Sequence, residues 1–194
     1  MGKRIVIIQG HPDPAGGHLC HALAEAYEAG AREAGHAVET VTVATLGWPL
    51  LTTKAAFEGP APPEVEQVQA VIAAANHLAI VFPLWLGGMP AVLKGFLEQA
   101  FRPGFLLLDR GGRWGGRRRL KGVTARIVVT MGMPALAYRW WFGAHGVRTL
   151  ASGILGFAGI GPVRTTYLGM VEAAGAAKRA RWLGDARRLG AAGA

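Results

Sequence analysis

The chain has 194 residues, of which 51% are hydrophobic and 17% charged, and it carries a formal net charge of +9. This composition suits one globular domain over residues 1–194 that buries roughly 70% of its unfolded surface, and it excludes disordered and collagen-like chains. A membrane span is not expected, because the longest apolar stretch, residues 78–93, is interrupted by Gly and Pro.

The first half of the chain alternates strand and helix patterns. Residues 5–8 form a short, β-branched apolar run, which is typical of a strand buried on both faces of a parallel sheet. The run is too short for a signal peptide, so we expect mature, cytoplasmic protein. The next predicted elements are a helix over residues 19–34, a strand over 37–43, a helix over 63–76 and a strand over 77–82.

The second half continues the alternation. Pro90 suits the first turn of a helix whose apolar stripe extends to Phe101. The later predicted elements are a turn-rich insert over residues 102–122, a strand over 125–129, a mixed helical region to 161, a strand over 163–168 and an amphipathic helix over 172–189. Five strands joined by right-handed helical crossovers predict a flavodoxin-like, doubly wound five-stranded parallel sheet of order 2-1-3-4-5, with helices on both faces.

The positive charge is concentrated in the turn-rich insert. Eight basic residues lie between Arg102 and Arg126, against the single acidic residue Asp109. Such a segment suits phosphates, an anionic membrane or nucleic acid, or is simply a solvated connection. No helix-turn-helix, zinc-finger or RNA-recognition motif accompanies it, so we expect no specific nucleic-acid partner.

Metal and disulfide chemistry is not expected. Cys20 is the single cysteine, and none of the six histidines forms an H-x-x-x-H or H-E-x-x-H pair. The nearest approach to a ligand pair is His18 and His21, three residues apart. Redox chemistry therefore needs a cofactor.

The functional site is expected beyond the carboxyl ends of strands one, three and four, where the strand order reverses. Three loops end there, over residues 9–19, 82–90 and 130–138. The first loop leads into a helix N-terminus, which favours a phosphate, and His11 and His18 add donors. A turn stiffened by prolines, without any ligand, is the alternative.

The other two loops carry aromatic side chains and glycines. Trp85 with Gly87 and Gly88 suits a flat ring that the backbone approaches closely, although Trp85 and Met89 are alternatively core side chains. Tyr138 and His145 lie seven residues apart, so on a helix they would share one face and contact a developing negative charge. Glycines at 143 and 146 weigh against a continuous helix.

Several segments together resemble the NAD(P)H:quinone oxidoreductase family of flavodoxin-like flavoproteins, which includes DT-diaphorase and modulator of drug activity B. The resemblance rests on His11-Pro12-Asp13-Pro14, on Pro83-Leu84-Trp85 with Gly88-Met89-Pro90 and the helix that follows, and on Thr130-Met131-Gly132. It implies a homodimeric flavoenzyme that carries FAD, or alternatively FMN, and passes two electrons from NAD(P)H to a quinone or a similar acceptor.

The resemblance also implies residue roles. Tyr138 and His145 would be catalytic, stabilising negative charge on the reduced flavin. The residues expected to bind the cofactor are His11, His18, Leu19, Cys20, Pro83, Leu84, Trp85, Leu86, Gly87, Thr130, Met131, Gly132, Met133 and Tyr138. The sequence departs from the family pattern where Ala15-Gly16-Gly17 stands before His18, where Cys20 replaces a frequent Asn, and where Leu86 and Gly87 replace aromatic residues.

The leading hypothesis is a ping-pong reductase, in which NAD(P)H and the quinone alternate in one cleft. The alternative is a regulatory flavoprotein subunit of a membrane potassium-efflux system, with residues 110–121 in peripheral contact with the partner or the membrane. The homodimer is expected also from the apolar segment 138–142, which one domain would not bury completely.

Overall fold

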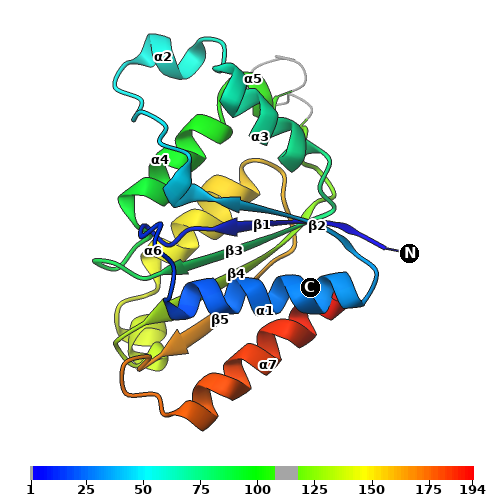
Figure 1. The fold of residues 1–194 in the computed structure, drawn as a ribbon. Helices are drawn as coiled ribbons and strands as arrows, with labels where there is room; N and C mark the ends of the chain where they lie inside the picture. Colours follow the sequence, from blue (N-terminus) through cyan, green and yellow to red (C-terminus); the bar gives the residue numbers. More distant parts are fainter. Residues whose placement is uncertain (1, 108–117) are drawn as a thin grey trace.

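The computed structural model describes residues 2–107 and 118–194. Five strands form one sheet in the order β2-β1-β3-β4-β5 with parallel pairing throughout, which confirms the predicted topology (Figure 1). The strands are β1 (Arg4–Gln9), β2 (Ala37–Thr42), β3 (His77–Pro83), β4 (Thr124–Met131) and β5 (Val163–Gly169). The order reverses between β1 and β3, which places the expected site at their carboxyl ends.

Helices cover both faces of the sheet. On one face Ile5 and Ile7 pack with α1 (Leu19–Glu33) and α7 (Ala176–Ala192), and on the other Val6 and Ile8 pack with α3 (Pro63–Ala73) and α4 (Ala91–Ala100). Since successive side chains of a strand point to opposite faces, one apolar run supplies both cores. The remaining helical segments are η1 (Val43–Thr45), α2 (Lys54–Glu58), α5 (Pro103–Leu106), η2 (Ala137–Trp141), α6 (His145–Arg148) and η3 (Thr149–Gly156).

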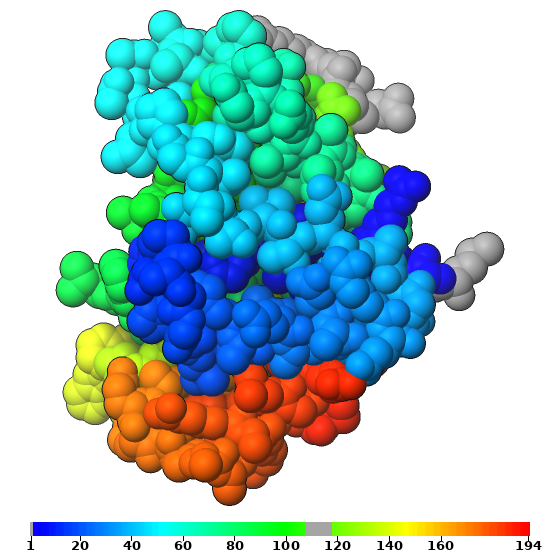
Figure 2. Space-filling view, in the orientation of Figure 1, coloured from blue at the N-terminus to red at the C-terminus, as the bar shows by residue number. Residues whose placement is uncertain are grey.

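The pair α1 and α7 crosses at two glycines. A Cβ on Gly30 would lie 2.7 Å from the Arg187 carbonyl carbon, and one on Gly190 would lie 2.8 Å from the Tyr27 carbonyl carbon. The helices therefore touch backbone to backbone, as their adjacent blue and red surfaces illustrate (Figure 2). This contact fixes α1, whose first turn borders the site.

Some predicted boundaries are wrong. The closing helix begins at Ala176 rather than at 172, because Gly175 is its extended N-cap, with φ −69° and ψ 168°, and the residues before it form turns. The helix predicted over 63–76 ends at Ala73. Short α2 and α5 have too few residues for an apolar period to reveal them.

The basic insert is described only at its ends, since residues 108–117 lie outside the described part of the chain. Arg118 Nη1 donates to the Gly156 carbonyl at 3.1 Å, and Arg119 Nε donates to the Phe105 carbonyl at 2.8 Å. These two side chains thus brace neighbouring elements. Within residues 2–107 and 118–194, no helix has the length and apolar character to cross a membrane.

Candidate active site

The three predicted loops meet at the carboxyl edge of the sheet. Gly10 N donates to Val81 O at 2.8 Å, joining the loop after β1 to β3. Leu84 N donates to Thr130 O, also at 2.8 Å, joining the loop after β3 to β4. The loop after β3 projects beyond this edge in Figure 1, and the dark-blue loop after β1 lies at the same edge in Figure 2. This edge is where an open parallel sheet binds its ligand.

A tight turn over residues 85–88 forms one wall of the site. Trp85 and Gly88 exchange two backbone hydrogen bonds of 2.9 Å. Between them Leu86 and Gly87 both have positive φ, 48° and 80°, which defines a type I′ turn. Within the described residues, the N–H groups of Leu86 and Gly87 have no acceptor, so both remain available to a bound group.

Tyr138 ties this turn to the segment after β4. Its side chain is 2% exposed, its hydroxyl donates to Gly87 O at 3.0 Å, and it accepts from Val147 N at 3.4 Å. Burial raises the pKa of Tyr138, so the hydroxyl is a protonated donor at neutral pH. Its proton is directed at the turn rather than at open solvent.

His145 reaches the same cavity by a different backbone path. The helical-face argument from the spacing of Tyr138 and His145 is wrong, because Gly143 and Ala144 adopt φ of 64° and 50° and end the helix between them. A Cβ on residue 143 would lie 2.6 Å from His145 Nε2, so the glycine makes room for the imidazole. Gly146 allows the start of α6 to approach the turn, since a Cβ there would lie 2.6 Å from Gly88 Cα.

Together these segments enclose a largely apolar cavity of about 320 Å³. Its lining residues are Leu84, Leu86, Gly87, Met133, Tyr138, Phe142 and His145. Six of these seven were expected from the sequence, and Phe142 was missed as a site residue. Its signal was the aromatic run ahead of Gly143, for which only a dimer contact was expected.

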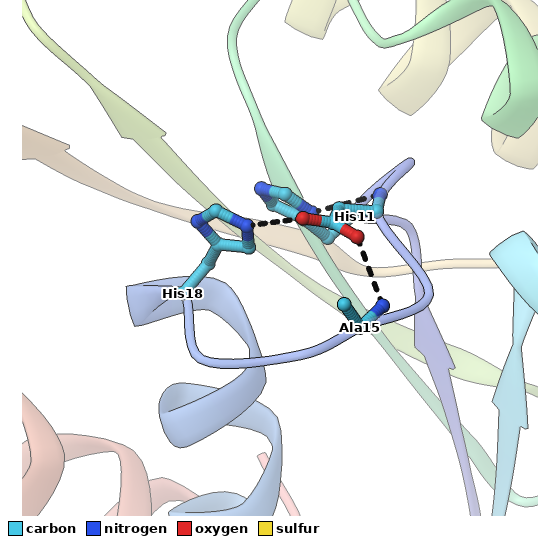
Figure 3. Close-up of polar contacts among 4 residues, drawn as sticks. His11, Ala15 and His18 are labelled. Atoms are coloured by element: carbon cyan, nitrogen blue, oxygen red, sulfur yellow. Dashed lines mark hydrogen bonds and ion pairs between the residues drawn. The ribbon is translucent and has the colours of Figure 1, made fainter.

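A second part of the site is polar and lies where the loop after β1 enters α1. Asp13 N donates to His11 Nδ1 at 3.1 Å, Ala15 N donates to Asp13 Oδ1 at 2.9 Å, and His18 Nε2 lies 2.8 Å from Asp13 Oδ2 (Figure 3). Burial and the neighbouring His18 and His21 lower the pKa of His11. The hydrogen bond from His18 is the largest cause that lowers the pKa of Asp13, which is therefore a carboxylate at neutral pH.

Other predicted residues lie beneath or beside the cavity. Cys20 Sγ and Thr130 Oγ1 are buried and 3.2 Å apart, and burial raises the pKa of the thiol to about 11. Met131 belongs to the core, while Trp85 is 52% exposed. Leu19, Pro83 and Gly132 do not line this cavity; they lie at the start of α1, at the end of β3 and directly after β4.

Comparison with known proteins agrees with the fold. The chain belongs to the family described as flavodoxin-like fold (Flavodoxin_2), whose model matches residues 3–189. An uncharacterized NAD(P)H oxidoreductase of Haemophilus influenzae is 29% identical over 119 residues, which cover 60% of this chain and 57% of that protein. The match therefore spans little more than half of the relative's length.

Solved structures show the same architecture. An NAD(P)H:quinone oxidoreductase from Methanothermobacter marburgensis has a TM-score of 0.82 at 22% identity, covering 98% of this chain and 96% of that one. An FMN-dependent NADH-azoreductase from Bacillus anthracis, solved in complex with FMN, has a TM-score of 0.75 at 15% identity, covering 98% of both chains. At these identities the likeness establishes the fold.

Proposed function

We propose that the protein is a flavin-dependent NAD(P)H:quinone oxidoreductase with a ping-pong mechanism. The observation that carries this proposal is the cavity at the carboxyl ends of β3 and β4, where the hydroxyl of Tyr138 and the imidazole of His145 lie beside the open N–H groups of the 85–88 turn. The named activities of the Haemophilus and Methanothermobacter proteins support the same reaction class.

The residues present fit a flavin. A Cβ built on Gly87 or Gly88 meets no atom of the described residues within 4 Å, so a flat ring has open space beside the turn. Both amide atoms of Gln9, which is 3% exposed at the end of β1, lack a partner among the described residues. In the first turn of α1, the N–H groups of Leu19 and Cys20 have no acceptor in the described part of the chain and are open to a phosphate. A bound flavin would accept a hydride from NAD(P)H and deliver it to a quinone.

Different residues of the chain would contact different parts of the flavin. Leu84 to Gly87 would border the flavin ring, with Pro83 and Trp85 supporting the turn, and Thr130 to Met133 would cover its pyrimidine side. Tyr138, once its hydroxyl proton turns from Gly87 O toward the ligand, and His145 would stabilise the negative charge left after hydride transfer, because donors held in an apolar cavity do this better than water. His11, His18, Leu19 and Cys20 would hold the phosphate end. FAD is our prediction, with FMN as the alternative.

A spectrum of the purified protein tests the proposal. We expect flavin absorption bands that bleach with anaerobic NADPH and return when a benzoquinone is added to the same cuvette. A colourless protein that takes up neither FAD nor FMN would overturn the proposed activity and leave the fold unaffected.

We propose a reducing, cytoplasmic location, which suits the free, buried Cys20.

We also propose that the protein acts as a homodimer. Four large apolar side chains next to the cavity are 53–86% exposed, namely Leu136, Trp140, Trp141 and Phe142. A patch of this kind is usually covered by a partner. Light scattering should give a dimer, and Trp141→Glu should give a monomer, whereas Arg181→Glu on the exposed face of α7 should not. A monomeric wild type would contradict the proposal.

A further inference from the structure

Three imidazoles gather at the start of α1. The ring centroids of His11 and His18 are 4.1 Å apart and stacked, and the His21 centroid lies 4.9 Å from His11 and 5.6 Å from His18. The acidic group acting on this cluster is Asp13, which contacts His18. Two further features favour an anion here, because the N–H groups of Leu19 and Cys20 have no acceptor in the described residues and α1 directs its positive dipole end at the cluster.

Several ring nitrogens of these three histidines have no hydrogen-bond partner within the described residues. His11 accepts from Asp13 N through Nδ1, so its neutral ring carries the proton on Nε2. That ring is 8% exposed, and its Nε2 has no partner within the described residues. Both ring nitrogens of His21 are shielded from solvent without a hydrogen-bond partner in the same part of the chain. A buried ring N–H of His21 without a partner is costly, which favours a ligand that accepts hydrogen bonds.

The inserted Ala15-Gly16-Gly17 produces this arrangement. Gly16 and Gly17 have φ of 78° and 77°, which lets the chain turn back and place His18 over His11. Asp13 then reaches His18 from within the same loop. The titratable groups at this point are His11, Asp13 and His18 of the loop and His21 of α1. Glu25 lies one turn further along α1, and Gln9 at the end of β1 is neutral.

We propose that Asp13 is an internal counter-anion of a three-imidazole phosphate site, and that a bound phosphate group replaces its carboxylate at His18 and recruits His21. This inference rests on the proposed function, since the phosphate would be that of the flavin. In the free protein the carboxylate of Asp13 pairs with the His18 imidazole, and for the same reason it competes with the ligand. Burial lowers the pKa of His11, so a phosphate that favours the protonated form of this ring should bind more tightly as pH falls.

Flavin titrations test the competition directly. Binding of FMN and of riboflavin to the flavin-free protein is followed by quenching of flavin fluorescence. Asp13→Asn keeps the oxygen that accepts from Ala15 N and removes the charge, so FMN affinity should rise roughly threefold to tenfold. His21→Gln should lower FMN affinity by about tenfold. Riboflavin, which lacks phosphate, should bind equally in both variants.

His36→Gln is the matched control, because His36 lies beyond the far end of α1 and contacts Lys3 N and Ala191 O. It should leave the ratio of FMN to riboflavin affinity unchanged. Unchanged FMN affinity in Asp13→Asn and His21→Gln would overturn the inference while leaving the flavin function intact.

Inorganic phosphate gives a readout that does not depend on flavin. In NMR titrations the ring signals of His11, His18 and His21 should move with phosphate, more strongly at pH 6 than at pH 8, and those of His36 should not. If these signals move but no flavin binds, the proposed function fails and the phosphate site stands. Signals that ignore phosphate would contradict the site.

Discussion

Tyr138 and His145 are the two polar side chains of an otherwise apolar cavity, and only Tyr138 is anchored by hydrogen bonds within the described residues. Tyr138→Phe combined with His145→Leu removes both donors. We expect turnover of NADPH with a benzoquinone to fall by roughly a hundredfold, because each donor would stabilise charge that develops during the reaction. Flavin content by absorbance should stay at the wild-type level. Phe142→Leu, which alters the same wall without removing a donor, should lose far less turnover. Full activity in the double variant would exclude the assigned role.

The backbone conformation of Leu86, in the turn that forms one wall of the site, lowers the stability of the folded protein. Its side chain is fully exposed at 109%, and its φ of 48° is unfavourable for a residue with a branched, apolar side chain. Asn at the first central position of a type I′ turn adopts this conformation readily, so Leu86→Asn should increase the free energy of unfolding by about 1 kcal/mol. Thermal denaturation measures the gain. Leu86→Ala retains a Cβ and the strain, so an equal gain in that variant would show that loss of the exposed side chain, not the backbone, was responsible.

At the scale of helices, the crossing of α1 and α7 gives a test with a matched control. Gly30→Ala places a methyl group 2.7 Å from the Arg187 carbonyl carbon, so the helices must separate. We expect a loss on the order of 2 kcal/mol in the free energy of unfolding, although Ala is intrinsically the better helix residue. On α7, the nearest atom to a Cβ on Gly184 is Arg188 Nη1 at 3.8 Å, an ordinary contact. Gly184→Ala should therefore stabilise the protein by up to about 1 kcal/mol, as measured by urea unfolding. Equal effects of the two substitutions would exclude close packing at Gly30.

The elements differed in how well the sequence predicted them. β1 and β3 were predicted because a β-branched apolar run of strand length has few other uses, and the position of the loops followed from the strand order. The start of α7 was missed because the small residues Ala173 and Ala174 extend the helical composition into turns. Spacing along the chain describes a continuous helix, so it failed for Tyr138 and His145, where Gly143 reverses the backbone.

The clustering of His21 with His11 and His18 was also not predicted. It depends on the path of the Gly16-Gly17 turn, which places a loop residue against the first turn of α1. Glycine permits many paths, so the sequence alone did not select this one. The residue types were visible at this point, but their distances required the structure.

Across the whole molecule, the two ends of the sheet serve different purposes. Among the described residues, the carboxyl end has open N–H groups and the unpaired imidazole of His21, which suit a ligand. At the amino end, Lys3 Nζ donates to Gly193 O at 2.7 Å and Arg4 N donates to Asn76 Oδ1 at 2.8 Å. These bonds tie β1 to the C-terminal residues and to the start of β3. His77 is a buried histidine in this stabilising half, so the pH dependence of unfolding below neutral pH reports on it.

His77 should make the protein sensitive to acid. It is 1% exposed, its Nδ1 lies 2.6 Å from Thr124 Oγ1, and its ring stacks on Tyr27 at 6.5 Å. Burial, with smaller effects from Lys3 and Arg126, lowers its pKa to about 4. The unfolded chain, with an ordinary histidine pKa near 6.5, binds the proton more readily, so stability is present at neutral pH and is lost as pH falls from about 6.5 toward 4. The loss attributable to this group is up to about 3 kcal/mol.

Replacing His77 with Phe isolates this contribution, because Phe keeps an aromatic ring against Tyr27 and cannot be protonated. Urea unfolding at fixed protein concentration should show wild type losing stability between pH 6.5 and 4.5 more steeply than His77→Phe, by roughly 2–3 kcal/mol over that range. His36→Gln, which removes a less buried histidine at the same end, should keep the wild-type slope. Parallel curves for wild type and His77→Phe would mean that acid destabilises the protein elsewhere, and the His11 cluster, whose His11 pKa is lowered for the same reason, would be the next group to replace.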